Sequence, residues 1–146
     1  MSSNIIVGID GSEHSLSAYQ WALDEARRRD ADLTAVFAWE TPLIGIPGAF
    51  DRDELEQVAQ KFLNEQLDGQ SVDTNGVTVH RVVAQGDPSA SLIEACKQAD
   101  AEMLVLGSRG RGGFAGLLLG SVGQECAANA PCPVLICKAN GDRPDA

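Results

Sequence analysis

Four glycines and two arginines crowd one short segment: Gly107, Gly110, Gly112 and Gly113, with Arg109 and Arg111 between them. Glycine lets the backbone approach a bulky anion, and successive N–H groups in such a loop can point at that anion. Shortly after, Gly120 and Ser121 precede a helical pattern, and a helix N-terminus also attracts negative charge. The chemistry favours a site for a polyphosphate. The alternative is a flexible glycine loop with solvated arginines.

Two other phosphate-binding patterns fit this chain less well. The pattern G-x-x-x-x-G-K-[ST] is absent, because no glycine is followed by lysine. Residues 110–115 do match G-x-G-x-x-A. However, they follow the fourth predicted strand instead of the first, and no acidic residue about 20 positions on could hold a ribose. Dinucleotide binding is therefore disfavoured.

Asp10 stands at the end of the first apolar run, directly before Gly11 and Ser12. A carboxylate in this place can face a ligand beyond the end of the strand. It could equally well serve the first turn of the following helix. The sequence leaves both roles open.

No set of residues forms an evident catalyst. The two histidines, His14 and His80, are far apart in sequence. We expect His14 to face solvent from the first helix, and His80 to pack or reach water from a strand. Asp10 or Glu40 could position a water molecule, which would give slow hydrolysis at best.

The four cysteines, Cys96, Cys126, Cys132 and Cys137, form no C-x-x-C pair. Buried or idle thiols are a better interpretation than a zinc site or disulfides.

Strand and helix patterns alternate along the chain. Apolar runs predict strands over 5–9, 33–39, 77–83, 103–106 and 133–137. Between them, Ser12, Asp51 and Asp87 are predicted N-caps. The helices are expected over 13–29, through the apolar positions Leu55, Val58, Phe62 and Leu67, after Pro88, and over 121–129. Residues 40–50 read as a mobile loop.

This alternation predicts an α/β fold, a doubly wound parallel five-stranded sheet with helices on both faces. Ligands of such sheets bind beyond the carboxyl ends of the strands, where strand order reverses. Asp10 and the glycine loop would face one crevice if the first and fourth strands are neighbours. We therefore prefer the order 3-2-1-4-5 to 2-1-3-4-5. No linker divides residues 1–146, so we expect a single domain with a loose tail over 138–146.

Composition limits the partners. The formal net charge is −10, whereas nucleic-acid and anionic-membrane binders need basic surface. No run of 18 apolar residues suggests a membrane span, and the first residues do not resemble a signal peptide. We expect a cytoplasmic protein that binds neither nucleic acid nor membrane.

The spacing of the glycines resembles a known signature. Gly107-x-x-Gly110, nine further residues and then Gly120-Ser121 match the pattern G-x2-G-x9-G-[ST] of the ATP-binding universal stress proteins. The resemblance covers about residues 4–138 and includes Val7-Gly8-Ile9-Asp10-Gly11-Ser12, Leu117-Leu118-Leu119-Gly120-Ser121-Val122 and Pro133-Val134-Leu135-Ile136. The glycine signature shows no departure from the family pattern.

The resemblance implies ATP as the ligand, with Mg or Mn as an accompanying ion, and it implies roles by position. Gly8 and Ile9 would contact the nucleoside, and the backbone of Ala38 would recognise adenine. Gly120, Ser121 and Val122 would donate to the outer phosphates. Asp10 would lie near the ribose or the phosphates and is the candidate metal ligand. The ribose and phosphates would be wrapped by Leu106, Gly107, Ser108, Arg109, Gly110, Arg111 and Gly112.

The resemblance also implies a homodimer. Independently, the last strand, with Val134, Leu135, Ile136 and Cys137, would be an apolar edge that needs covering or pairing. Pairing with the same strand of a second copy is one solution; cover by the tail is the other.

We therefore expect a nucleotide-responsive regulator of the stress response and not an enzyme. A slow ATPase or nucleotidyl-transfer enzyme of similar fold is the main alternative. A subunit resembling the electron-transfer flavoproteins, with a structural nucleotide, is a weaker one.

Overall fold

The computed structural model describes residues 3–40, 51–110 and 119–138. Its strands are β1 (Asn4–Gly8), β2 (Asp32–Trp39), β3 (Val79–Gln85), β4 (Met103–Gly107) and β5 (Val134–Cys137). Its helices are α1 (Glu13–Arg29), α2 (Arg52–Asp68), α3 (Pro88–Ala99) and α4 (Ser121–Asn129).

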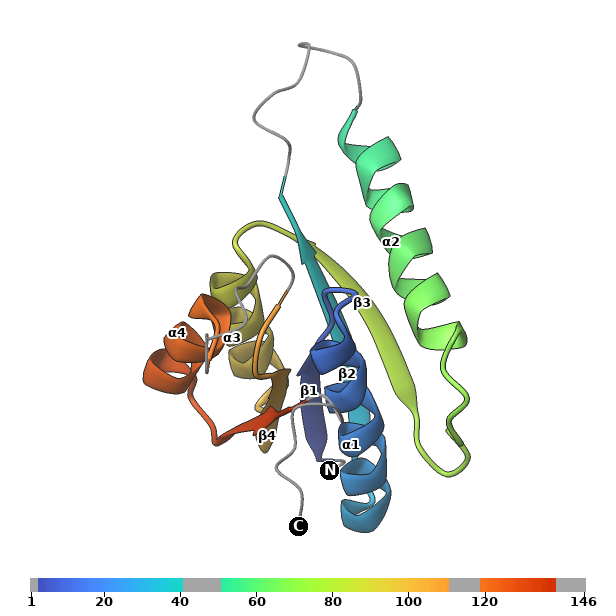
Figure 1. Ribbon diagram of the computed structural model, residues 1–146, viewed down its shortest axis with the longest axis vertical. Coiled ribbons are helices and arrows are strands. Elements are labelled where there is room, and N and C mark those ends of the chain that lie inside the picture. The colour runs from blue at the N-terminus through green and yellow to red at the C-terminus, as the bar shows by residue number, and fades with distance from the viewer. Residues whose placement is uncertain (1–2, 41–50, 111–118, 139–146) are drawn as a thin grey trace.

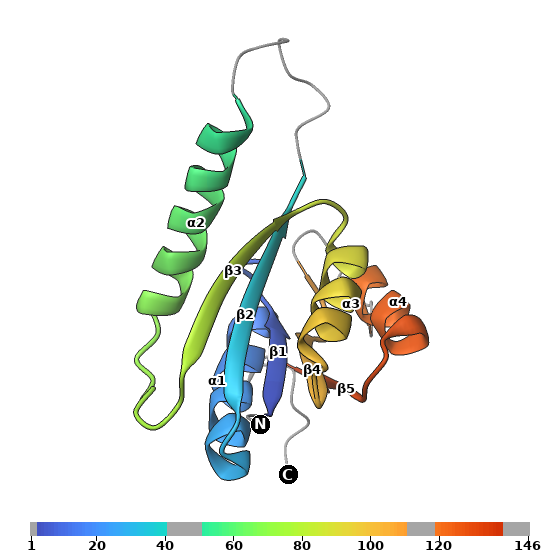
Figure 2. The ribbon, with the colours of Figure 1, turned by 180° about the vertical axis from the view of Figure 1, so that it is seen from behind.

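The strands form one parallel sheet in the order β3-β2-β1-β4-β5, which confirms the predicted topology. Helices α1 and α2 cover one face of the sheet, and α3 and α4 cover the other (Figures 1 and 2). β1 lies between β2 and β4, with Ile5 opposite Leu33 on one side and Met103 on the other. Because all strands run the same way, their carboxyl ends gather at a single edge.

The side chains of the strands feed two cores, one on each face. Ile5, Val7 and Leu33 pack against Tyr19 and Leu23 of α1, together with Leu63 and Leu67 of α2. On the opposite face, β1 and β4 contribute Ile6, Leu104 and Leu106, which pack against Leu92, Cys96 and Cys126. Burial on both faces explains why the central strands read as continuous apolar runs.

The predicted caps begin the helices. The hydroxyl of Ser12 accepts from the Ser15 N–H at 3.1 Å, and Asp51 and Asp87 do the same for Glu54 and Ala90 at 2.8 and 3.0 Å. α1 and α3 end alike, with Asp30 and Asp100 in the left-handed conformation at φ of 53° and 49°. After these corners, Asp32 and Glu102 donate to the carbonyls of Ser3 and Asn4, at 2.8 and 2.9 Å. The two corners thus lead the chain into the strands that flank β1.

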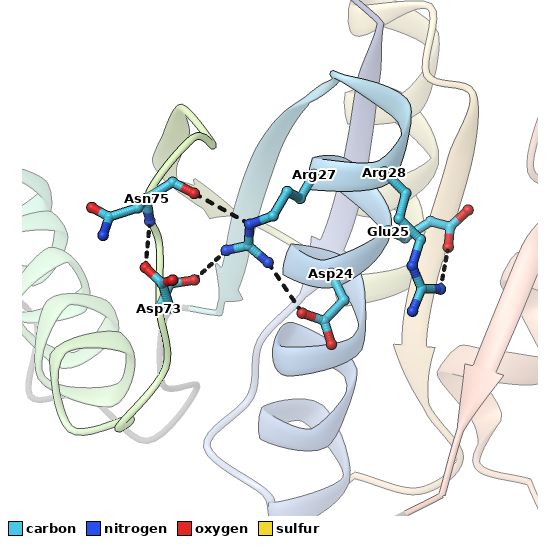
Figure 3. Close-up of polar contacts among 6 residues, drawn as sticks. All are labelled: Asp24, Glu25, Arg27, Arg28, Asp73 and Asn75. Carbon is cyan, nitrogen blue, oxygen red and sulfur yellow. Dashed lines mark hydrogen bonds and ion pairs between the residues drawn. The ribbon is translucent and has the colours of Figure 1, made fainter.

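Arg27 ties the end of α1 to the connection between α2 and β3 (Figure 3). Its guanidinium donates to the backbone carbonyls of Asp73 and Asn75 and to the carboxylate of Asp24. Asn75 in turn donates its N–H to the side chain of Asp73 at 2.9 Å, which closes a small turn. A connection of polar residues is thereby given a fixed position beside the first helix.

One strand boundary was predicted wrongly. β3 covers 79–85 and not 77–83, because Gly76, with a φ of +82°, belongs to a turn that delays pairing until Val79. The helix predicted through Leu55, Val58, Phe62 and Leu67 is present as α2. Its buried residues are Ala59, Leu63 and Leu67, and Val58 is 65% exposed. Of the loop predicted over 40–50 and the tail predicted over 138–146, residues 41–50 and 139–146 lie outside the described residues.

Candidate functional site

The candidate site lies at the carboxyl ends of β1 and β4, where strand order reverses. β1 connects to α1 and β2 on one side, whereas β4 leads to α4 and β5 on the other side. The two connections therefore diverge from neighbouring strands and leave room between them, as in other doubly wound sheets. The predicted proximity of Asp10 and the glycine loop follows from this order.

The start of the glycine loop packs directly on the first turn of α1. A Cβ at Gly107 would lie 2.5 Å from the backbone carbonyl carbon of His14. Ser108 is 3% exposed, and its hydroxyl lies 2.8 Å from Nδ1 of His14. The guanidinium of Arg109 lies 3.1 Å from Nε2 of the same ring. Gly107 is thus required by close packing.

Asp10 faces both the helix start and the glycine loop. Its Oδ1 accepts from the N–H of Ser12 at 2.9 Å and from the Ser12 hydroxyl at 2.6 Å. A Cβ at Gly110 would lie 2.6 Å from its other oxygen, Oδ2. The helix-turn role of Asp10 is therefore present in the fold. Its second oxygen is turned to the loop, as the other role requires.

The two halves of the glycine signature meet. The N–H of Gly120 donates to the carbonyl of Ser108 at 2.8 Å, and a Cβ at Gly120 would lie 3.6 Å from Cα of Arg109. The N–H of Gly120 is consequently used inside the protein, which narrows the expected phosphate donors to Ser121 and Val122. Gly120 is the N-cap of α4 and supplies no side-chain cap to the first turn. The first N–H groups of such a helix suit an anion.

The backbone of Ala38 points past the end of β1. The carbonyl of Val36 accepts from the Ile9 N–H at 2.9 Å, so even-numbered residues of β2 face β1. The carbonyl of Trp39 accepts from the Gly86 N–H on the opposite side at 2.7 Å. Since backbone direction alternates along a strand, Ala38 directs its N–H and its carbonyl toward β1's side, beyond Gly8. One donor and one acceptor therefore lie side by side at the crevice.

A cavity of about 420 Å³ lies between the end of β2 and α2. Its lining is mainly apolar and aromatic: Phe37, Trp39, Leu55, Val58, Ala59 and Phe62, with the carboxylates of Asp10 and Glu40. The rings of Phe37 and Phe62 lie 4.7 Å apart at an interplanar angle of 43°, which fixes α2 against the strand. Such a cavity suits a flat, partly apolar group.

The remaining predicted residues are distributed between core and surface. Gly8 packs tightly: a Cβ there would lie 2.8 Å from Leu106 Cδ2. Ile9 and Leu106 are 3% and 4% exposed and belong to the cores, so their contribution to a site comes from backbone atoms. Ser121 is exposed, and Val122 packs on the core near α3. Arg111 and Gly112 lie outside the described residues.

The expectation that His14 faces solvent is wrong. The first turn of α1 directs its ring to Ser108 and Arg109, whereas His80 contacts Asp32 at 3.0 Å near the start of the sheet. The cavity residues of α2 were also missed. The alternation of Phe37 and Trp39 on one face of a strand is the signal that could have indicated them.

Three of the four cysteines are buried, and Cys132 is partly exposed. Burial, reinforced by the adjacent Cys132, raises the pKa of Cys96 to about 12. Burial also raises the pKa of Cys126 to about 11. Within residues 3–40, 51–110 and 119–138, no group of three or more His, Cys, Asp or Glu side chains could hold a metal ion. In the same ranges, no helix is both long enough and apolar enough to cross a membrane.

Comparison with known proteins identifies the family to which this chain belongs. The model of the universal stress protein family matches residues 1–138. The chain belongs to the universal stress protein family. A universal stress protein of Mycobacterium tuberculosis (strain H37Rv) is 37% identical over 134 residues, which are 92% of this chain and 44% of that protein. One from Mycolicibacterium smegmatis is 40% identical over 136 residues, 90% of this chain and 44% of that protein. This chain thus spans less than half the length of these relatives.

Solved structures share the fold of this universal stress protein. The hypothetical protein MJ0577 aligns with a TM-score of 0.80 at 18% identity, over 100% of this chain and 99% of that one. A universal stress protein in complex with cAMP aligns with a TM-score of 0.66 at 24% identity, over 95% and 98%. A universal stress protein from Archaeoglobus fulgidus in complex with dAMP gives 0.60 at 19%, over 93% and 98%.

Proposed function

We propose that this universal stress protein binds ATP in the crevice between β1 and β4 and acts as a nucleotide-responsive regulator of the stress response. The observation that carries the proposal is the meeting of three distant segments. The first turn of α1, the loop after β4 and the start of α4 come together through the Gly120–Ser108 hydrogen bond and the contact of Gly110 with Asp10. Solved relatives of the same fold hold cAMP and dAMP, which supports a nucleotide ligand.

The phosphates would lie against the start of α4 and the glycine loop. Ser121 and Val122 occupy the first turn of α4, where N–H groups and the helix dipole favour negative charge. Arg109 lies two residues after the end of β4 and brings a guanidinium to this edge of an acidic protein. Local cationic and amide groups can thus hold a polyanion despite the net charge of −10.

Adenine would lie near the end of β2. The N–H and the carbonyl of Ala38 offer a donor and an acceptor to the N1 and the amino group of the base. Guanine presents a donor and an acceptor in the reverse order and would be rejected, because buried polar groups would face like partners. The adjacent cavity, with Phe37, Trp39 and Phe62, would provide apolar contact.

A divalent ion would be bound mainly through the phosphates and not by a preformed set of protein ligands. Asp10 turns one carboxylate oxygen toward Gly110, and the described part of the chain brings no further ligand cluster to it. Mg²⁺ is commonly held by one or two carboxylates, phosphate oxygens and water. Mg²⁺ or Mn²⁺ would supply charge neutralisation of the phosphates, and Asp10 would be its protein ligand.

Calorimetric titration with ATP and Mg²⁺ tests the proposal, with Gly110→Val as the variant. Valine places its Cβ 2.6 Å from Asp10 Oδ2 and restricts the backbone of the loop. We expect loss of ATP binding and an unchanged circular dichroism spectrum. Gly69→Ala is the matched control, because Gly69, the C-cap of α2, has a right-handed helical backbone conformation that alanine can adopt. Undiminished affinity in Gly110→Val would overturn the assignment of the loop.

A regulator and a slow ATPase differ in turnover. Of the two histidines, His14 contacts Ser108 and Arg109, and His80 contacts Asp32 near the opposite edge of the sheet. We therefore expect phosphate release from ATP at the rate of the Gly110→Val control. Steady release well above that control would favour the enzyme. Mass spectrometry of small molecules carried through purification would identify the nucleotide directly.

A further inference from the structure

His14 links two consecutive residues of the glycine loop. Its Nδ1 lies 2.8 Å from the hydroxyl of Ser108, and its Nε2 lies 3.1 Å from a terminal nitrogen of Arg109. Ser108 is 3% exposed, so the first of these contacts is shielded from water. One imidazole therefore spans the point where β4 gives way to the loop.

The partners decide which ring nitrogen carries the proton. A guanidinium has only donors, so Nε2 must accept from Arg109. In the neutral ring the proton is then on Nδ1, which donates to the oxygen of Ser108. The Arg109 contact requires this tautomer, and the Ser108 hydroxyl, which can donate or accept, is compatible with it. With its proton on Nδ1, the neutral ring cannot take a proton from Ser108 through that nitrogen. The pair is consequently suited to hold a geometry and not to activate a serine.

We infer that His14 is a positioning residue for phosphate binding: it holds the Arg109 guanidinium and the Ser108 hydroxyl in place at the start of the glycine loop. The inference rests on the proposed ATP site. Arginine side chains lose considerable rotamer freedom when they bind a phosphate. A partner that fixes the side chain beforehand lowers this cost, which raises the affinity for the phosphates and leaves the affinity for the nucleoside unchanged.

The backbone around His14 makes the residue testable. Gly107 packs on the Cβ and the main chain of His14, which alanine retains. His14→Ala should therefore fold and lose only the ring. His80→Ala is the matched control, because His80 is half exposed and contacts Asp32 away from the site.

We expect His14→Ala to weaken ATP binding about three- to tenfold, the range that follows from freeing one long side chain. Adenosine, which lacks phosphates, should bind His14→Ala and wild type alike, and His80→Ala should leave both affinities unchanged. Unchanged ATP affinity in His14→Ala, or an equal loss for adenosine, would overturn the inference. Wild-type protein that binds neither compound would overturn the proposed function itself.

Two conservative variants separate the contacts. In His14→Gln, the side-chain amide is long enough to offer an oxygen near the place of Nε2, and it should restore ATP affinity. In His14→Asn, the amide reaches only the place of Nδ1 and should behave like alanine. The opposite order would assign the effect to Ser108 and contradict a role through Arg109.

A double-mutant cycle and NMR complete the test. If His14 acts through Arg109, adding His14→Ala to Arg109→Ala should cost no further ATP affinity. Additive losses would refute that route. Independently of any nucleotide, long-range ¹H–¹⁵N spectra of the free protein should show the proton of His14 on Nδ1. A proton on Nε2 would overturn the inference even if ATP binds.

Discussion

Glycines of one signature serve different physical purposes. Gly107 is required because a Cβ would meet the main chain of His14 at 2.5 Å, whereas Gly120 would bring its Cβ only into ordinary contact at 3.6 Å. Gly110 is intermediate, since its neighbour is the end of a side chain, Asp10 Oδ2. The same residue type thus meets a strict packing requirement at Gly107 and weaker ones at Gly110 and Gly120.

This difference predicts that two alanine substitutions change the free energy of unfolding by unequal amounts. Gly107→Ala forces β4 and α1 apart and should lower the free energy of unfolding by about 1–3 kcal/mol. Gly120→Ala should change it by less than about 1 kcal/mol, the usual effect of replacing a glycine N-cap. Urea unfolding followed by circular dichroism measures both. Equal effects would show that the close contact at Gly107 relaxes freely.

The thiols should differ in reactivity because the thiolate is the reactive form. With pKa values of about 12 and about 11, Cys96 and Cys126 remain protonated at pH 8, and both are buried. Cys132 is the one cysteine with partial exposure. We expect one rapid phase with Ellman's reagent in native protein at pH 8, and its loss in Cys132→Ser. A rapid phase that persists in this variant would contradict the order of exposure.

At the scale of elements, the corners after α1 and α3 resemble each other. Each helix ends on an aspartate in the left-handed conformation, Asp30 or Asp100, and the next alanine donates back into the last turn, to Ala26 or Cys96. Aspartate tolerates this conformation better than most residues, but glycine adopts it without a Cβ penalty. A negative charge at a helix C-terminus is also unfavourable.

Asp30→Gly and Asp100→Gly should therefore each stabilise the protein, by up to about 1 kcal/mol. The corners lie on opposite sides of β1, so the gains should add. Thermal unfolding of the two single variants and the double variant gives the comparison. A lowered Tm in either single variant would mean that the aspartate side chain stabilises its corner.

The side of the cavity that α2 forms allows a test of adenosine binding. Val58 lines the cavity and is 65% exposed, so Val58→Asp should weaken adenosine binding while the free energy of unfolding changes by less than about 0.5 kcal/mol. Gln57→Asp adds the same charge next to it on an exposed position outside the lining and is the control. Equal adenosine affinity in both variants would show that the cavity does not contribute to adenosine binding.

The sequence predicted the elements far better than their contacts. Caps such as Ser12 and Asp87 are local chemistry, so the helix starts were predictable. Strand order followed from one requirement, that Asp10 and the glycine loop share a crevice. The cavity was not predictable, because the contact of Phe37 with Phe62 depends on how α2 lies on the sheet. His14 was misjudged for the same reason, since no local pattern tells where a helix turn meets another strand.

At the scale of the molecule, β5 is an outer strand of the sheet. The carbonyls of Pro133 and Cys137 bond to β4, so the N–H and carbonyl of Val134 and Ile136 point outward. An outer edge of this kind can pair with another strand. We propose that a second copy of the chain pairs there, at Val134, Leu135, Ile136 and Cys137.

Analytical ultracentrifugation should show a dimer at micromolar concentration. Val134→Pro removes one outward donor and retains the bonds to β4, and proline is tolerated at the first position of an edge strand. We expect a monomer with an almost unchanged Tm. Wild type that sediments as a monomer would refute the pairing, and a dimeric Val134→Pro would place the interface elsewhere.

The contact of His14 with Ser108 joins residues 94 positions apart in the sequence. The start of α4, which bonds to Ser108 through Gly120, lies still later in the sequence. A crevice formed by such distant segments exists only in the folded protein. A nucleotide that binds there therefore stabilises the folded state against the unfolded state by mass action. Proteases attack opened chains. If ATP binds as proposed, a fall in the adenine-nucleotide concentration would therefore lower the folded fraction and speed proteolysis.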